Sequence, residues 1–158
     1  MTQKDKELLL KDLSARLPYR VYISPVDCGK AILIGIKDGN PLLWDTIHKK
    51  EYDKPWDIEY VRPYLRPMSS MTEKEKEEFS KLLVKRYCEE DWEEHISTSY
   101  CIEIDNVYTD DEDGIKYPST FSMDAIDWLN AHHFDYRGLI EKGLAIEAPK
   151  GMYNIKEK

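Results

Sequence analysis

The side chains best suited to chemistry lie in one short stretch, where two tyrosines and two arginines alternate as Tyr60, Arg62, Tyr64 and Arg66. In an extended chain this period of two points all four side chains to the same side. The guanidinium groups could then bind a phosphate or a partner carboxylate bidentately, and the aromatic rings could stack on bases. The same residues could instead serve structure, through stacking of Arg on Tyr and pairing with acidic side chains. Both interpretations stay open.

A second candidate set comprises His132, His133 and Asp135, which could act as acid or base. Adjacent residues on a helix diverge by about 100°, so the two imidazoles cannot easily bind one metal ion. An imidazole at a helix C-terminus is also favoured by the backbone dipole without any catalytic purpose. If these residues do serve chemistry with Arg62 and Arg66, all of them must converge on one pocket.

Motifs for nucleophilic catalysis and for phosphate binding are absent from the sequence, which contains no GxSxG, SxxK, HExxH, GxGxxG or GxxxxGK[ST] pattern. The acidic stretch 109–114 is not an EF-hand loop: aligning Gly114 with the invariant glycine puts Thr109 and Thr120 where Asp and Glu are needed. The sequence therefore predicts no cofactor and no metal site, and it favours a protein that is not an enzyme.

Composition predicts a folded protein of the cytoplasm. Hydrophobic residues make up 41% of the 158 residues, with 11 Tyr and 4 Trp, which suffices for a packed core. No apolar run approaches the roughly 20 residues that span a bilayer, and the N-terminus does not resemble a secretion signal. Cys28, Cys88 and Cys101 form no CxxC pair, so we expect reduced thiols.

The net charge of −8 is unevenly distributed. Residues 1–70 hold 12 basic and 10 acidic residues, whereas residues 71–158 hold 11 basic and 21 acidic residues. A negative field repels nucleic acid and anionic lipid and favours cationic partners. Binding to nucleic acid or membrane is therefore not expected, and a protein partner is.

In the first part of the chain, leucines at helical spacing predict a helix over residues 4–17, which Pro18 ends. Three β-rich runs near residues 21–23, 32–36 and 42–47 follow, separated by turn residues, and predict an antiparallel meander. The two prolines at 63 and 67 exclude a helix, predict an extended segment, and argue against a strand inside a sheet.

In the second part, Thr72 and Glu75 form a capping box, which predicts an amphipathic helix from there to between Cys88 and Glu94. Alternation over residues 100–108 predicts a strand. Ser122 is the expected N-cap of a helix, followed by a second short helix over about 136–142 and a last strand at 144–146. This order predicts an α+β fold as a single domain over 1–158, with flexible ends at 1–3 and 151–158.

The predicted helix pair is not a DNA-binding helix-turn-helix. Residues 121–146 carry a net charge of −2, and DNA recognition depends on basic side chains.

Two segments of the sequence resemble a family of small proteins from gut Bacteroidetes and their phages or mobile elements. They are residues 60–72 (YVRPYLRPMSSMT) and 127–144 (DWLNAHHFDYRGLIEKGL). The opening KDLSARLPY, residues 11–19, is also similar to this family. The family has no assigned activity, so the resemblance implies a bacterial or phage cytoplasm and nothing about catalysis. The region from Val21 to Asp57 is outside the resemblance.

Three functional hypotheses follow. The first is a non-enzymatic interaction protein of a bacterial or phage accessory system, which binds through the Tyr60–Arg66 strip or through the acidic second half. The second is an enzyme or ligand-binding protein for a phosphorylated or nucleotide-like molecule, in which Arg62 and Arg66 hold the anion. The third is a mimic of nucleic acid, which requires acidic side chains at 103, 105 and 110–113 to line up on one surface. The oligomeric state is not predicted.

Overall fold

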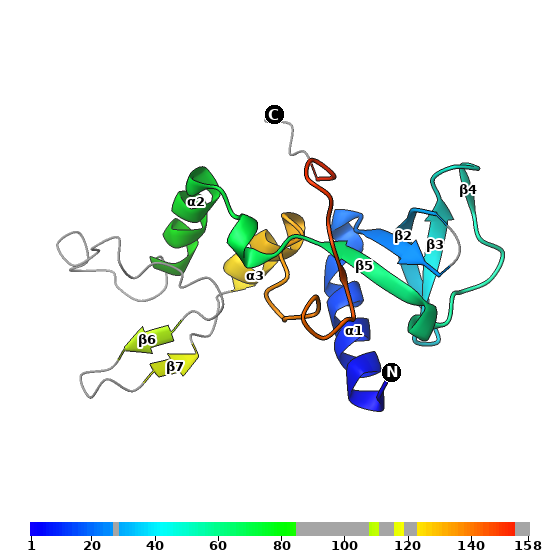
Figure 1. The fold of residues 1–158 in the computed structure, drawn as a ribbon, viewed down its shortest axis with the longest axis horizontal. Helices are drawn as coiled ribbons and strands as arrows, with labels where there is room; N and C mark the ends of the chain where they lie inside the picture. The colour runs from blue at the N-terminus through cyan, green and yellow to red at the C-terminus, as the bar shows by residue number, and fades with distance from the viewer. Residues whose placement is uncertain (27–28, 85–107, 111–115, 119–122, 154–158) are drawn as a thin grey trace. The chain divides into compact units, whose positions relative to one another are not determined.

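The computed structural model describes residues 1–26, 29–84, 108–110, 116–118 and 123–153, and the chain divides into two compact units. Unit 1 comprises residues 1–67 and 130–158, and unit 2 comprises residues 68–129. Figure 1 shows the elements of both units with the labels used below. The sequence of unit 1 has 17 basic and 14 acidic residues (+3), and that of unit 2 has 6 basic and 17 acidic (−11). The acidity of the protein therefore belongs to unit 2.

The α+β class is confirmed, including the N-terminal helix and the meander that follows it. Helix α1 (Gln3–Arg16) starts at Thr2, whose side chain and backbone amide form a capping box with Asp5. Leu9 and Leu13 are buried on the face that contacts the sheet. Thr2 and Gln3 thus belong to a capped helix, although residues 1–3 were predicted as a flexible end.

Unit 1 is built on a six-stranded sheet with the order β4-β3-β2-β1-β5-β8, in which only the β5–β8 pair is parallel. The meander β1-β2-β3 was predicted from its β-branched runs and the turns between them. One face of the sheet packs on α1 and forms the core, with Ile23, Leu33, Leu43, Val61 and Leu65 fully or almost fully buried. The strands are β1 (Tyr22–Pro25), β2 (Ala31–Lys37), β3 (Asn40–Asp45), β4 (Lys50–Glu51), β5 (Val61–Leu65) and β8 (Ile146–Glu147).

Strand β5 lies inside the sheet, between β1 and β8, so the prediction that prolines would keep this segment out of a sheet interior is wrong. The reason is that the N–H and C=O groups of successive residues along a strand point alternately to its two neighbouring strands. The carbonyl of Leu65 accepts a bond from the Ala148 amide on the β8 side, so the backbone of Pro63 points to that side too. Because β8 begins only opposite Tyr64, no ladder bond needs an N–H from Pro63.

The second helix of the predicted C-terminal pair does not form, and residues 136–145 instead make a series of turns. Gly138 and Gly143 have φ values of +67° and +66°, in the left-handed region that interrupts an α-helix. The expected last strand is present as β8, shifted to Ile146–Glu147 and only two residues long.

Unit 2 contains α2 (Glu73–Val84), β6 (Tyr108–Asp110), β7 (Lys116–Pro118) and most of α3 (Met123–Ala131). The predicted capping box of α2 is confirmed, because the amides of Thr72 and Glu75 bond each other's side chains. Phe79 of α2 is fully buried, and its ring centroid lies 5.4 Å from that of Trp128 of α3. Three short 3-10 helices complete the described chain, at Leu17–Tyr19, Ile58–Tyr60 and Met68–Ser70.

Several predictions fall outside the described residues. They are the end of the helix that begins at Glu73, the strand over 100–107, the acidic stretch 111–115, the cap at Ser122 and the surroundings of all three cysteines. The acidic alignment required of a nucleic-acid mimic belongs with them.

Candidate functional site

The predicted strip of alternating Tyr and Arg is split by the fold. Arg62 and Tyr64 lie on one face of β5 and are half-buried, while their neighbours Val61, Pro63 and Leu65 are buried in the core. Tyr60 belongs to the preceding 3-10 helix and is 54% exposed. The period of two therefore holds within the strand, but it does not place Tyr60 on that strand.

The guanidinium group of Arg62 is hydrogen-bonded to backbone carbonyls of the same chain. Its Nε donates to the carbonyl of Gly143 at 2.9 Å, and its Nη1 donates to the carbonyls of Glu59 and Val61 at 2.9 and 2.8 Å. These bonds hold the 138–143 turns against the start of β5. The geometry favours the structural interpretation of Arg62.

Arg66 contacts the segment that holds His133 and Asp135 of the second candidate set, although this set begins 66 positions later in the sequence, at His132. Its amide donates to the carbonyl of His133, and its carbonyl accepts from the amide of Asp135, both at 2.8 Å. The guanidinium group of Arg66 lies over the Phe134 ring, 4.1 Å from its centroid. The fold thus brings Arg66 to His133 and Asp135 and leaves Arg62 bound elsewhere.

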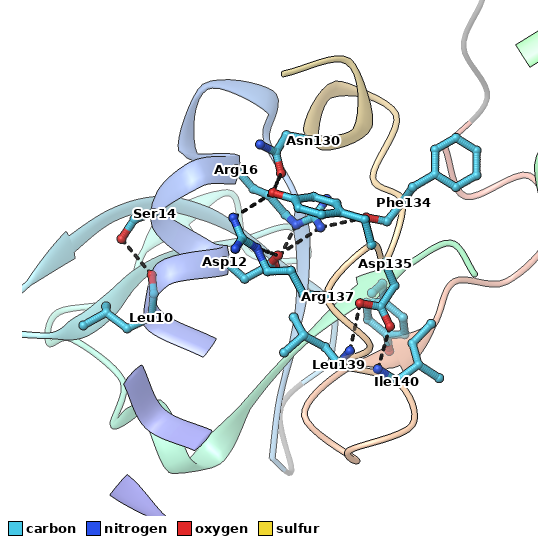
Figure 2. A network of polar contacts seen from close by, with 12 residues as sticks. Leu10, Asp12, Ser14, Arg16, Asn130, Phe134, Asp135, Arg137, Leu139 and Ile140 are labelled. Carbon is cyan, nitrogen blue, oxygen red and sulfur yellow. Dashed lines mark hydrogen bonds and ion pairs between the residues drawn. The ribbon is translucent and has the colours of Figure 1, made fainter. Parts of the chain in front are cut away.

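Asp135 is buried, and its carboxylate caps the turns that follow it. Oδ1 accepts from the amide of Leu139 at 2.8 Å and Oδ2 accepts from the amide of Ile140 at 2.7 Å, as Figure 2 shows. These bonds satisfy two amides that would otherwise be buried without partners. Asp135 therefore positions the turns that lead from it towards β8.

His133 is only 7% exposed and has a left-handed backbone, with φ of +60°. Its ring stacks on the Tyr153 ring with centroids 3.8 Å apart, and among the described residues its Nδ1 has no hydrogen-bond partner. Burial lowers the pKa of His133 to about 3, helped by the nearby positive charges of Arg16, His132 and Arg66. The imidazole is neutral at physiological pH, which does not suit a proton donor there.

A buried ionic cluster lies beside His133, and Figure 2 shows its polar contacts. Arg16 is fully buried and binds both carboxylate oxygens of Asp12, at 2.7 and 3.0 Å. Its Nη2 also donates to the carbonyl of Phe134 at 2.8 Å, while its Nη1 has no hydrogen-bond partner in the part of the chain that the structure describes. Arg137 approaches the same carboxylate, with its Nε at an ion-pair distance of 3.2 Å from Asp12 Oδ1, and this Nε makes no hydrogen bond to any residue that the structure describes. We call Asp12, Arg16, His133, Phe134 and Arg137 the arginine junction.

The arginine junction was not singled out from the sequence. The available signal was an Asp followed four residues later by an Arg on a predicted helix, a spacing that allows pairing. That spacing also occurs on many exposed helix faces, so it does not predict that the Asp12–Arg16 pair is buried.

A second polar cluster lies in the turn after β3, where Asp45 Oδ1 accepts from the amides of Ile47 and His48. The Nδ1 of His48 lies 2.7 Å from Asp45 Oδ2. The His48 side-chain bond, with the two amides, lowers the pKa of Asp45 to about 2. We call residues 45–49 the Asp45 turn.

The Asp45 turn borders a cavity of about 460 Å³. Its lining mixes Lys30 and Lys50 with Glu51 and Asp53, so it selects neither an anion nor a cation. Among the described residues, no group of three His, Cys, Asp or Glu side chains is placed to bind a metal ion. The cavity therefore does not define a ligand by charge.

The face of the sheet opposite the core carries apolar and aromatic side chains. Tyr22 of β1 lies opposite Ile32 of β2, which lies opposite Trp44 of β3, so the three form a row across the strands. All three are half-buried, as is Leu42, and Ile34 at a β-bulge is 42% exposed. We call Tyr22, Ile32, Ile34, Leu42 and Trp44 the open sheet face.

Comparisons with family models, with curated proteins and with solved structures find no match for this chain. The resemblance to proteins of gut Bacteroidetes and their phages stays a prediction, as do the roles of the predicted site residues. In the part of the chain that the structure describes, no helix has the length and apolar character needed to cross a membrane.

Proposed function

We propose that this protein is a non-enzymatic interaction protein that binds a mainly apolar surface of another protein through the open sheet face. The supporting observation is the row Tyr22, Ile32 and Trp44, which keeps aromatic and aliphatic surface in contact with solvent. Contiguous exposed apolar surface is typical of binding sites, and aromatic side chains are enriched at the centres of protein interfaces.

The charge near this face supports a protein partner over a nucleic acid. Unit 1 carries a net charge of only +3. Lys30 lies over the Tyr22 ring, 4.8 Å from its centroid, and Arg62 binds three backbone carbonyls. Nucleic-acid binding depends on several basic side chains that are available to phosphates. The setting we propose is the cytoplasm of a gut bacterium or of its phage-infected state, on the resemblance of residues 60–72 and 127–144.

The test uses two variants that place a carboxylate on an exposed isoleucine. Ile34→Glu changes the open sheet face, and Ile47→Glu changes the Asp45 turn, where Ile47 is 68% exposed. A partner is first captured from a Bacteroidetes lysate, identified and purified, and its affinity for each variant is then measured by calorimetry. We expect Ile34→Glu to weaken binding at least tenfold, about 1.4 kcal/mol, and Ile47→Glu to bind like the unmodified chain. Equal affinities for the two variants, or no reproducible partner, would contradict the proposal.

The alternative is a binding site for a phosphorylated molecule at Arg66, supported by the contact of Arg66 with the His133–Asp135 segment. The bonds of Arg62 to three carbonyls count against the second arginine of that hypothesis. A titration with inorganic phosphate and with a nucleotide, followed by NMR, separates the two arginines. The alternative expects shifts that Arg66→Gln abolishes and Arg62→Gln preserves, and it is rejected if no shift occurs.

A further inference from the structure

The last described segment of the chain, residues 146–153, is attached to the sheet by few contacts, and we call it the strap. Its strand β8 pairs with only Tyr64 and Leu65 of β5, and both of its residues are exposed. The Ala148 amide adds one bond to the Leu65 carbonyl, and a turn closed by the Met152 amide and the Pro149 carbonyl follows. The strap then ends at Tyr153, whose side chain enters the protein.

The hydroxyl of Tyr153 lies between two strands. The pairing of β1 with β5 ends at Ile23 and Pro63, and the next residues in that register are Tyr22 and Tyr64. Here the Tyr22 amide donates to the Tyr153 hydroxyl at 3.0 Å, and that hydroxyl donates to the Tyr64 carbonyl at 2.8 Å. A side-chain hydroxyl thus satisfies two backbone groups, one on each strand.

The rings around Tyr153 complete a slot with specific chemistry. The His133 ring stacks on it with an interplanar angle of 23°, and the Tyr22 ring lies 5.6 Å away at a tilt of 38°. Burial lowers the pKa of His133, so the stacked imidazole is neutral, and burial raises the pKa of Tyr153, so the phenol keeps the proton that it donates. The slot offers one backbone donor, one backbone acceptor and aromatic walls, which matches a neutral phenol.

We propose that this slot is a binding site for a tyrosine side chain, which the chain fills with its own Tyr153 and vacates when the strap detaches. A tyrosine of a partner protein can then take the place of Tyr153. Mostly exposed segments can open locally without global unfolding, and residues 146–151 of the strap are exposed except for the half-buried Ala148. Tyr22 belongs both to the slot and to the open sheet face, but the proposal does not require binding at that face.

Amide hydrogen exchange of the unmodified full chain, followed by NMR, tests whether the strap detaches. The Tyr22 and Ala148 amides both report the attached strap, whereas the Leu33 amide bonds the Val21 carbonyl within the sheet. We expect the first two amides to exchange at matching rates, at least tenfold faster than the Leu33 amide. If the Tyr22 amide exchanges only as slowly as the Leu33 amide, the strap does not open separately and the proposal fails.

Chemical rescue tests what the slot recognises. In the full-length Tyr153→Ala variant, p-cresol restores both the ring and the hydroxyl, and toluene restores only the ring. We expect p-cresol to slow exchange of the Tyr22 amide at least tenfold and toluene to leave it fast. Equal protection by the two compounds, or protection by neither, overturns the assignment.

If Tyr153→Ala does not fold, Tyr153→Phe provides the second variant, because it keeps the ring and removes only the hydroxyl. We then expect at least tenfold faster exchange of the Tyr22 amide than in the unmodified chain. Unchanged exchange of the Tyr22 amide would show that the hydroxyl does not hold the slot.

Discussion

The arginine junction and the Asp45 turn both pair an acidic side chain with a basic one a few residues along the chain, and they differ in burial. Asp12 and Arg16 are both 0% exposed, whereas the Asp45 side chain is 10% exposed and only its partner His48 is largely exposed, at 68%. A buried charge that loses its partner cannot return to water, while an exposed one is solvated at once. Similar spacing in the sequence therefore produces an interaction that the fold depends on in one region and a local turn contact in the other.

Removal of Asp12 is the most severe test of this difference. We expect Asp12→Ala to lower the free energy of unfolding by about 3–5 kcal/mol, because it leaves the Arg16 guanidinium buried without its carboxylate. Urea unfolding measures the change. Glu7→Ala, at an exposed position of the same helix, serves as the control and should stay within about 0.5 kcal/mol of the unmodified chain. If Asp12→Ala lowers the free energy of unfolding by as little as the control does, burial is not what distinguishes the arginine junction from the Asp45 turn.

We expect low pH to destabilise the protein through the buried imidazole of His133. The pKa of His133 is about 3 when folded and about 6.5 in a free histidine, so the unfolded chain binds the extra proton between these values. Stability should therefore fall as the pH drops from 6.5 towards 3, by up to about 1.4 kcal/mol per pH unit from this residue. We expect His133→Asn, which tolerates the left-handed backbone, to flatten that slope in unfolding measured across this range.

The matched control is His48→Asn, which removes an exposed imidazole and should retain the slope of the unmodified chain between pH 6.5 and 4, above the range in which Asp45 titrates. If His133→Asn keeps the same slope, another group is responsible for acid sensitivity.

The hydroxyl of Tyr153 provides an intermediate effect. Tyr153→Phe leaves the Tyr22 amide and the Tyr64 carbonyl without their shared partner, and we expect a loss of about 1–3 kcal/mol. Tyr60→Phe removes a hydroxyl from a side chain that is 54% exposed and should change stability by under about 0.5 kcal/mol. Thermal unfolding of the two variants side by side makes the comparison, and equal melting temperatures would contradict it.

The Asp45 turn should show the smallest effect, with the same sign as His133 but in a lower range of pH. The folded pKa of Asp45 is about 2, below its ordinary value of 3.8, chiefly because His48 and two amides bond the ionised carboxylate. Its contribution is fully present above pH 4 and is lost as the pH falls through 2. We expect the difference in melting temperature between the unmodified chain and Asp45→Asn to be small at pH 7 and to shrink between pH 4 and 2. A difference that stays constant over this range would refute the assignment.

Local patterns in the sequence predicted much of the fold. The leucines of α1, the turn residues between β1, β2 and β3, and the capping box at Thr72 act over a few residues, so their effects can be read directly. The prediction failed at Pro63, because the cost of a missing N–H depends on which neighbour that backbone position faces. It failed again at 136–142, where the left-handed Gly138 and the Asp135 cap replace a helix with turns.

The candidate site was less accessible to sequence reasoning. The period of two in the Tyr60–Arg66 strip indicated which side chains share a face, but only the fold shows that Arg62 binds Gly143 and that Arg66 lies over Phe134. Only residues 151–153 of the strap fall in the predicted flexible end 151–158, and nothing near Tyr153 in the sequence indicates a bond to Tyr22, 131 residues away.

The sequence by itself determined the α+β class, the amphipathic faces and the separation of charge along the chain, because these properties depend on residue types and short spacings. The tertiary structure decided which of the two acidic and basic pairs has both partners buried, that His133 is neutral, and that Tyr153 bridges two strands. These outcomes depend on contacts between distant segments and on the water that those contacts exclude, and neither is encoded in local spacing.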